Sequence, residues 1–202
     1  MFNKKLLAAS MAAAISTGMV AQSHAMQMQE NNIGQMLLAP LYITAGDTNT
    51  DIIVVNTRTD AAVKAKVVFR EGLRSSEVLD FFIYLTPGDV WRGTVRGEVD
   101  AAILHSTDDS MTDASGTFAS ETNPVNQPFF DKEASGSNGM GHIEIFGTYS
   151  ITTGTTNIVS QVDEKPIVVK EGMDKRDLRT LVEWIDDGSP ANPFPTPSGS
   201  LA

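Results

Sequence analysis

The 202-residue sequence contains no cysteine. This absence excludes a disulfide framework, a zinc or iron–sulfur site with cysteine ligands, and a thiol nucleophile. The folded protein must therefore be stabilised by the burial of an apolar core. The chain is long enough to build such a core as one domain.

Positive charge is also scarce. The chain has 15 lysine and arginine residues against 25 aspartate and glutamate residues, so its formal net charge is −10. An acidic chain without a basic cluster repels nucleic acid and anionic lipid, because both carry negative charge. We therefore expect no nucleic-acid partner, whereas recruitment of cations is compatible with this charge.

Motifs of catalysis and nucleotide binding are missing as well. The chain has no G-x-S-x-G, no Walker A and no G-x-G-x-x-G motif, and Gly-Met-Gly at 139–141 precedes an expected strand. His105 and Asp108 could complete a hydrolase triad with a nearby serine. The nearby serines, Ser106 and Ser110, lie in a polar segment without the sharp turn that exposes a nucleophile. We predict a non-enzymatic protein without a cofactor.

The amino-terminal residues 1–25 have the three parts of a secretory signal peptide. Lys4 and Lys5 form the positive region, residues 6–21 are mainly apolar, and Ser23-His24-Ala25 offers small residues before a cleavage point after Ala25. The apolar stretch is shorter than the roughly 20 residues of a membrane span. We therefore predict an exported protein, either extracellular, at the cell surface, or periplasmic, without a membrane span after cleavage.

The rest of the chain predicts a mainly β protein. Residues 78–95 contain two apolar runs, rich in β-branched and aromatic residues, on either side of Pro87-Gly88. This pattern predicts two strands joined by a tight turn, with Gly88 adopting the positive φ of a type II turn. The first run is apolar on both faces, which is typical of a strand at the centre of a sandwich.

Further strand patterns occur on both sides of this pair. Residues 63–69 alternate between an apolar and a mixed face, as in a half-exposed antiparallel strand. Pro40 restricts the strand expected at residues 36–43 to an edge or a bulge. Gly147 indicates a bulge between the strands expected at residues 142–146 and 149–151. The other expected strands are residues 36–43, 52–55 (buried), 101–105, 142–146 and 149–151. We predict a mainly β, antiparallel sandwich (Ig-like or Greek-key) over residues 33–188.

Three segments lack a strand pattern. Residues 26–32 form a polar, flexible leader, and residues 189–202 form a Pro/Ser/Gly-rich tail that we expect to be disordered. Residues 106–140 form a long loop. This loop is either a flexible surface excursion or is pinned to the sandwich by Phe129 and Phe130.

One amphipathic helix is expected near the end of the domain, at residues 174–187. Four residues share an apolar stripe at helical spacing: Leu178, Leu181, Val182 and Ile185. Asp174 is a suitable N-cap, and Gly188 followed by Pro190 supplies the stop signal.

Two triplets of polar residues present oxygen ligands: Asp47, Asn49 and Asp51, and Asp108, Asp109 and Asp113. The first has the spacing that opens a calcium-binding loop, but the later positions of an EF-hand are missing. Both triplets can instead form polar turns, in which the side chains bond to their own backbone. Nitrogen ligands are few, because only His105 and His142 remain after the signal peptide.

The larger aromatic side chains leave two interpretations, a stacking platform for sugar rings or membership of the core. They are Trp91, Trp184, Tyr42, Tyr84 and Tyr149.

The motifs run from Leu38–Ile43 through IIVVNTRTDAAVKAKVVFREG and LDFFIYLTPGDVWRGTV to GHIEIFGTY and GMDKRDLRTLVEWID. In this order they resemble a family of exported bacterial β-sandwich (Ig-like) surface proteins. The resemblance implies a place at the cell surface and supplies no catalytic residues. The Pro-rich end departs from the family, so a further carboxyl-terminal part remains conceivable.

Two classes of function stay open. One is a structural or adhesive component of the bacterial cell envelope or extracellular matrix, which acts through its surface and its edge strands. The other is a secreted or periplasmic module that binds a ligand, either a glycan or calcium. Residues 36–43 would leave an unpaired edge, to which the leader of a neighbouring copy could add a strand. The alternative is a monomer with a disordered leader.

Overall fold

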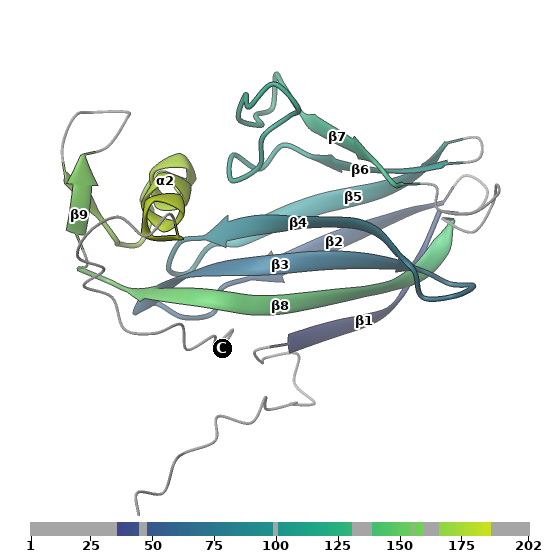
Figure 1. Cartoon of the computed structure of the whole chain (residues 1–202), viewed down its shortest axis with the longest axis horizontal. Helices are drawn as coiled ribbons and strands as arrows, with labels where there is room; N and C mark the ends of the chain where they lie inside the picture. Colours follow the sequence, from purple (N-terminus) through teal and green to yellow (C-terminus); the bar gives the residue numbers. More distant parts are fainter. Residues whose placement is uncertain are drawn as a thin grey trace, which may run out of the picture.

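A computed structural model describes residues 36–44, 48–98, 101–130, 139–154, 156–159 and 166–186 (Figure 1). The expected signal peptide, leader and tail lie outside the described residues. The strands are β1 (Met36–Ile43), β2 (Asn49–Val55), β3 (Ala61–Glu71), β4 (Glu77–Leu85), β5 (Val90–Glu98), β6 (Ala101–Ser106), β7 (Val125–Pro128), β8 (Met140–Thr152), β9 (Thr156–Val159) and β10 (Pro166–Val168). The helix is α2 (Lys175–Asp186).

Two four-stranded sheets form the body of the protein (Figure 1). Their strand orders are β1-β8-β3-β4 and β2-β5-β6-β7, and a small third sheet pairs β9 with β10. Every described strand pair is antiparallel. The inner faces of the two large sheets share one buried apolar cluster, so the predicted mainly β, antiparallel sandwich with one helix is confirmed.

This inner cluster follows from the period-2 pattern of the strands. On β3, the apolar face is buried throughout, at Val63, Ala65, Val67 and Phe69. Phe69 lies against Tyr42 and Phe129, with ring centroids 5.6 and 5.0 Å away. Facing β3 from the other sheet are Ile52, Val54, Trp91, Val95 and Leu104.

Trp91 is fully buried in this cluster and explains the glycine two residues later. A Cβ on Gly93 would lie 2.3 Å from Cη2 of the Trp91 ring. Both residues point to the inner face of β5, so the indole ring covers the backbone of Gly93. Residue 93 must therefore be a glycine, because any larger side chain would collide with the Trp91 ring.

The Pro87-Gly88 turn has the expected local geometry. Gly88 has a φ of 74°, and the Asp89 N–H donates to the Thr86 carbonyl at 3.1 Å. The buried Asn56 side chain braces the turn by donating to the Thr86 and Ala61 carbonyls, both at 2.9 Å.

The turn nevertheless connects different sheets, because β4 and β5 do not pair with each other. The expectation that β4 lies at the centre of the sandwich is therefore wrong: it is an edge strand. Its second apolar face has another cause. α2 packs on the outer side of β4 (Figure 1), where Tyr84 lies in a cluster with Leu178 and Leu181.

Two other expectations need correction. β2 is an edge strand whose outer face is open, since Ile53 and Val55 are 54% and 45% exposed. The segment 106–140 is not one long loop, because it contains β7, which pairs with β6. Phe129 is buried and pins this segment to the core, whereas Phe130 is exposed.

The predicted irregularities in β1 and β8 are present. β1 is an edge strand, as Pro40 requires, and its register shifts between Ala39 and Tyr42. In β8 the register against β3 shifts between Gly147 and Tyr149, next to the glycine that indicated a bulge. β9 and β10 were not expected from the sequence.

α2 begins where the capping residue predicted it. The Arg176 N–H donates to Oδ1 of Asp174 at 2.8 Å, and the Leu178 N–H donates to the Asp174 carbonyl at 3.1 Å. The helix buries a second apolar cluster, the helix cluster: Ala62, Tyr84, Ile151, Ile167, Val169, Met173, Leu178, Leu181 and Val182. Among the described residues, no helix has the length and apolarity needed to cross a bilayer.

Candidate functional site

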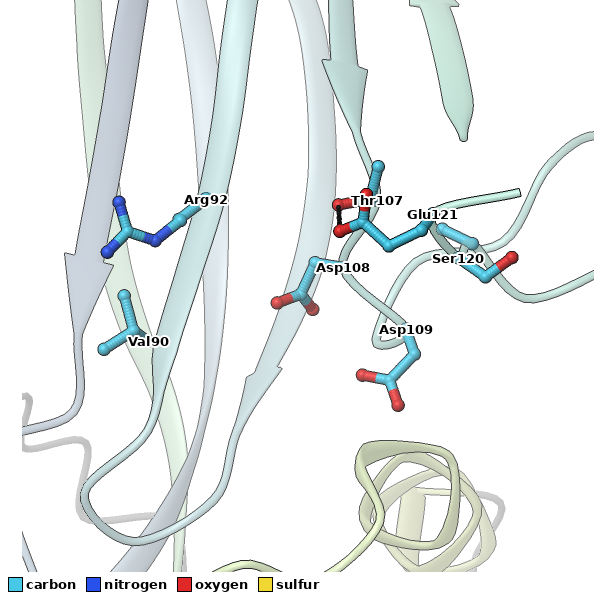
Figure 2. A pocket seen from close by; sticks show the side chains of 8 residues that line it. Val90, Arg92, Thr107, Asp108, Asp109, Ser120 and Glu121 are labelled. Carbon is cyan, nitrogen blue, oxygen red and sulfur yellow. Dashed lines mark hydrogen bonds between the residues drawn. The ribbon is translucent and has the colours of Figure 1, made fainter. Parts of the chain in front are cut away.

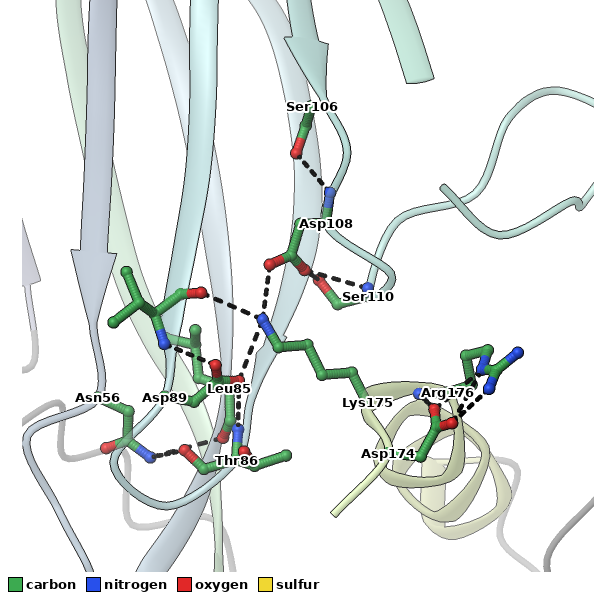
Figure 3. Close-up of polar contacts among 11 residues, drawn as sticks. Asn56, Leu85, Thr86, Asp89, Ser106, Asp108, Ser110, Asp174, Lys175 and Arg176 are labelled. Atoms are coloured by element: carbon green, nitrogen blue, oxygen red, sulfur yellow. Dashed lines mark hydrogen bonds and ion pairs between the residues drawn. The ribbon is translucent and has the colours of Figure 1, made fainter. Parts of the chain in front are cut away.

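The main group of buried polar residues lies at one end of the sandwich, between the β4–β5 turn, the segment after β6 and the start of α2 (Figure 3). Ser106 is 2% exposed, and its hydroxyl donates to the Arg92 carbonyl at 2.7 Å. Oδ1 of Asp108 accepts bonds from the N–H of Ser110 at 3.1 Å and from its hydroxyl at 2.6 Å. The chain after β6 is thus folded into a tight polar turn.

Lys175 joins this turn to the helix (Figure 3). Its Nζ lies 2.5 Å from Oδ2 of Asp108, 3.1 Å from Oδ2 of Asp89 and 3.2 Å from the Val90 carbonyl. Burial lowers the pKa of Lys175, but Asp108 and Asp89 outweigh this effect and leave the pKa raised. These four residues, the Lys175 cluster, therefore hold a buried ammonium group in its charged form.

Arg179 makes a second connection one turn further along α2. Its guanidinium donates to the Ser110 carbonyl at 3.4 Å and to the Thr112 hydroxyl at 3.2 Å. The same group lies over the Tyr84 and Phe118 rings, 5.8 and 5.7 Å from their centroids. The helix thus secures the segment after β6 through both charges and rings.

An open pocket of about 410 Å³ lies beside the Lys175 cluster (Figure 2). Its lining includes Arg92, Asp109 and Glu121, and the Thr107 hydroxyl donates to Glu121 at 3.2 Å. Burial, and then the neighbouring Asp108, raise the pKa of Asp109. The pocket is therefore predominantly acidic, and one of its carboxylates, Asp108, is paired with Lys175.

The residue types of a hydrolase triad are present here but are not arranged as one. Nδ1 of His105 lies 2.9 Å from Oδ1 of Asn126, on an exposed part of the surface. Ser106 follows His105 on the strand, so its side chain points to the opposite face of β6. Ser110 donates its proton to Asp108 and has no imidazole within hydrogen-bonding distance among the described residues. This arrangement offers no activated nucleophile.

The structure describes five of the six residues in the two triplets of oxygen ligands. Asn49 and Asp51 lie in β2 and not in a loop, Asp51 accepts a bond from the Thr94 hydroxyl at 2.7 Å, and Asp47 lies outside the described residues. Asp113 accepts bonds from Ser115 and Thr117, which lower its pKa, and so forms the polar turn that was the alternative. No group of three metal-binding side chains occurs in the part of the chain that the structure describes.

The interpretation of the larger aromatic side chains as core residues is confirmed for the three that the structure describes. Trp91, Tyr42 and Tyr84 are buried and belong to the two apolar clusters. The side chains of Trp184 and Tyr149 lie outside what the structure describes. Among the described aromatic side chains, those of Phe82 and Phe130 are exposed, at 41% and 63%.

Lys175 and Asp89 are the members of the polar site that sequence reasoning missed. A weak signal existed, because a lysine in the first turn of a helix lies at the end where the helix dipole disfavours positive charge. Its partners lie 67 or more residues away, so no local pattern identified them.

The edge formed by β1 and β2 is a second candidate surface. The Thr50 hydroxyl joins the two strands, since it accepts from the Ile43 N–H at 3.0 Å and donates to the Ile43 carbonyl at 2.8 Å. Exposed apolar side chains follow this edge: Leu38 at 53%, Leu41 at 59%, Ile53 at 54% and Val55 at 45%.

Comparisons with models of known protein families, with curated protein sequences and with solved structures found no match. The resemblance to exported surface proteins therefore stays a prediction.

Proposed function

We propose that this chain is a non-enzymatic, exported structural or adhesive component of the cell envelope or extracellular matrix, and that a second copy of the chain binds to its β1–β2 edge. The observation that carries the proposal is the difference between the two edges of the sandwich. At the edge with β4 and β7, the Phe130 N–H donates to the Val78 carbonyl at 2.7 Å, and Phe129 is buried. At the β1–β2 edge, Thr50 bonds to both backbone groups of Ile43, and no described residue covers the outer backbone of residues 36–41 in this way.

Charge favours a second copy as the occupant of this edge. The chain carries a formal net charge of −10, so two copies repel each other over most of their surfaces. β1 has no charged residue and presents Leu38 and Leu41 to solvent. Pairing along β1 would cover these leucines and satisfy its free backbone groups, with the least repulsion between the copies.

The association is tested by light scattering over a range of protein concentrations. We expect the mass of the protein to rise from monomer toward dimer, and a Leu38→Lys/Leu41→Lys variant to remain monomeric. Leu73→Lys is the matched control, because Leu73 is 74% exposed but lies in the β3–β4 turn. A wild-type protein that stays monomeric at every concentration would remove the support for association.

Export has its own test. The residues of the signal pattern support cleavage after Ala25, so mass spectrometry of the protein from fractionated cells should find a chain that begins at Met26. Recovery from the cytoplasm with an intact amino terminus would overturn this part of the proposal.

A further inference from the structure

A small groove lies at the edge of the sandwich opposite to β1 and β2, where α2 crosses the end of β4. It has a volume of about 180 Å³. Side chains from β4, the segment after β6, β7 and α2 meet there, among them Phe82, Met111, Thr112, Gln127, Arg179 and Glu183. The volume is below the several hundred Å³ of a pocket for a drug-sized ligand, so the groove suits a single ring.

Part of the groove lining is apolar. Phe82 is 41% exposed, and the Lys64 ammonium group lies over its ring, 4.3 Å from the centroid. Met111, which is 3% exposed, lies at the base of this lining and belongs to the inner cluster. An exposed aromatic ring beside a hollow offers a surface on which the flat, apolar face of a ligand can stack.

The lining of the groove also contains polar side chains, among them the Gln127 amide. Gln127 pairs with Leu104 on β6. Val125, two residues earlier on the same face of β7, is buried, so the Gln127 side chain lies on the inner face of this sheet. No described residue forms a hydrogen bond with this amide. Because an amide both donates and accepts hydrogen bonds, it matches a ligand hydroxyl group, which does the same.

The charges at the end of the groove are balanced. Arg179 donates to Oε1 of Glu183 at 2.6 Å, and the Glu183 side chain is 50% exposed, so its second carboxylate oxygen can accept further bonds. The charged residues that line the groove, Arg179 and Glu183, therefore carry no net charge together. A phosphorylated ligand would also be repelled by the net charge of −10.

We propose that this groove binds one sugar ring of a neutral glycan, with an apolar face of the ring on Phe82 and hydroxyl groups bonded to Gln127 and Glu183. The apolar and polar residues of the lining match the two kinds of surface on a sugar, which has patches of C–H on its faces and hydroxyl groups around its rim. This inference does not depend on association through the β1–β2 edge.

The test is saturation-transfer NMR with the methyl glycosides of glucose, galactose, mannose and N-acetylglucosamine. We expect at least one glycoside to receive saturation from the wild-type protein. The signal should fall to background in Phe82→Ala and in Gln127→Ala. It should persist in two matched controls, Phe130→Ala, which removes an exposed ring outside the groove lining, and Asn126→Ala, which removes the neighbouring amide.

The proposal is overturned if no glycoside receives saturation. It is equally overturned if the signal persists in both groove variants, or if it disappears to the same extent in Phe130→Ala. Thermal unfolding of each variant identifies loss of fold, which neither surface substitution should cause. The Leu38→Lys/Leu41→Lys variant should bind the same glycoside, so failure of edge association is distinguishable from failure of sugar binding.

Discussion

The two apolar clusters of this protein are closed in different ways. The inner cluster lies between two hydrogen-bonded sheets and joins residues from Tyr42 to Ile145. The helix cluster lies on the outside of one sheet and is covered by α2, which follows β10 near the end of the described chain. The first is enclosed by the fold as a whole, whereas the second depends on the attachment of one helix.

This difference indicates two levels of stability. Opening the inner cluster requires the sheets to separate, so its opening is equivalent to global unfolding. The helix cluster can open when α2 detaches, while the sandwich remains folded. The Lys175 cluster and the contacts of Arg179 oppose this detachment, because they join α2 to the β4–β5 turn and to the segment after β6.

Trp91→Ala should have the largest effect, because it removes the largest fully buried side chain of the inner cluster. We expect a loss of about 3–5 kcal/mol in the free energy of unfolding, measured by urea denaturation. The sheets and α2 should unfold together in this variant. Phe130→Ala, at an exposed ring, serves as the control and should change stability little. A nearly neutral Trp91→Ala would contradict enclosure of the ring.

Leu181→Ala should have a smaller and more local effect. Leu181 is fully buried under the helix, and its truncation should cost about 2–3 kcal/mol, at the lower end of the range for buried leucine because the helix can resettle. Hydrogen exchange should increase over residues 175–186 and stay unchanged over residues 61–71. Equal increases in both segments would show that the two clusters open as one unit.

Asp174→Ala should have the smallest effect, about 1 kcal/mol, because it removes the N-cap of α2. The pKa of Asp174 is lowered, mainly by its hydrogen bond with Arg176. The ionised Asp174 side chain therefore stabilises the folded protein fully at neutral pH, and this contribution is lost as the pH falls below 3.8. Hydrogen exchange of α2 should therefore differ between wild type and variant at pH 7, and the difference should shrink in acid. Asp174→Asn should keep the cap but lose this pH dependence; an unchanged dependence would assign it to another group.

Local patterns in the sequence were sufficient to identify most elements of the fold. The alternation over residues 63–69 identified β3, Asp174 located the start of α2, and Pro87-Gly88 identified the turn after β4. The patterns did not show which strands are neighbours. β4 is apolar on both faces because α2 covers Tyr84, and the sequence of β4 does not distinguish a covering helix from a second sheet.

The candidate sites were less accessible to sequence reasoning, for a physical reason. Asp113 and Ser115 form a turn from neighbouring residues, and such turns have the same composition as metal-binding loops. The Lys175 cluster joins residues that are far apart in the chain, and the groove around Phe82 is formed by four separate segments. Spacing along the sequence therefore identifies a local turn such as that at Asp113. It says little about the Lys175 cluster or the groove, whose residues are distant in the chain.

The position of β8 has a consequence for the order of folding. β8 lies between β1 and β3 in the sheet. In the chain it comes much later than both, because β1 ends at Ile43 and β3 at Glu71, whereas β8 begins only at Met140. During synthesis β1 and β3 therefore emerge with no partner between them, and their sheet cannot close until residues 140–152 are available. Such non-local pairing makes folding slow, and it keeps the early strands open to aggregation until the late strand is inserted.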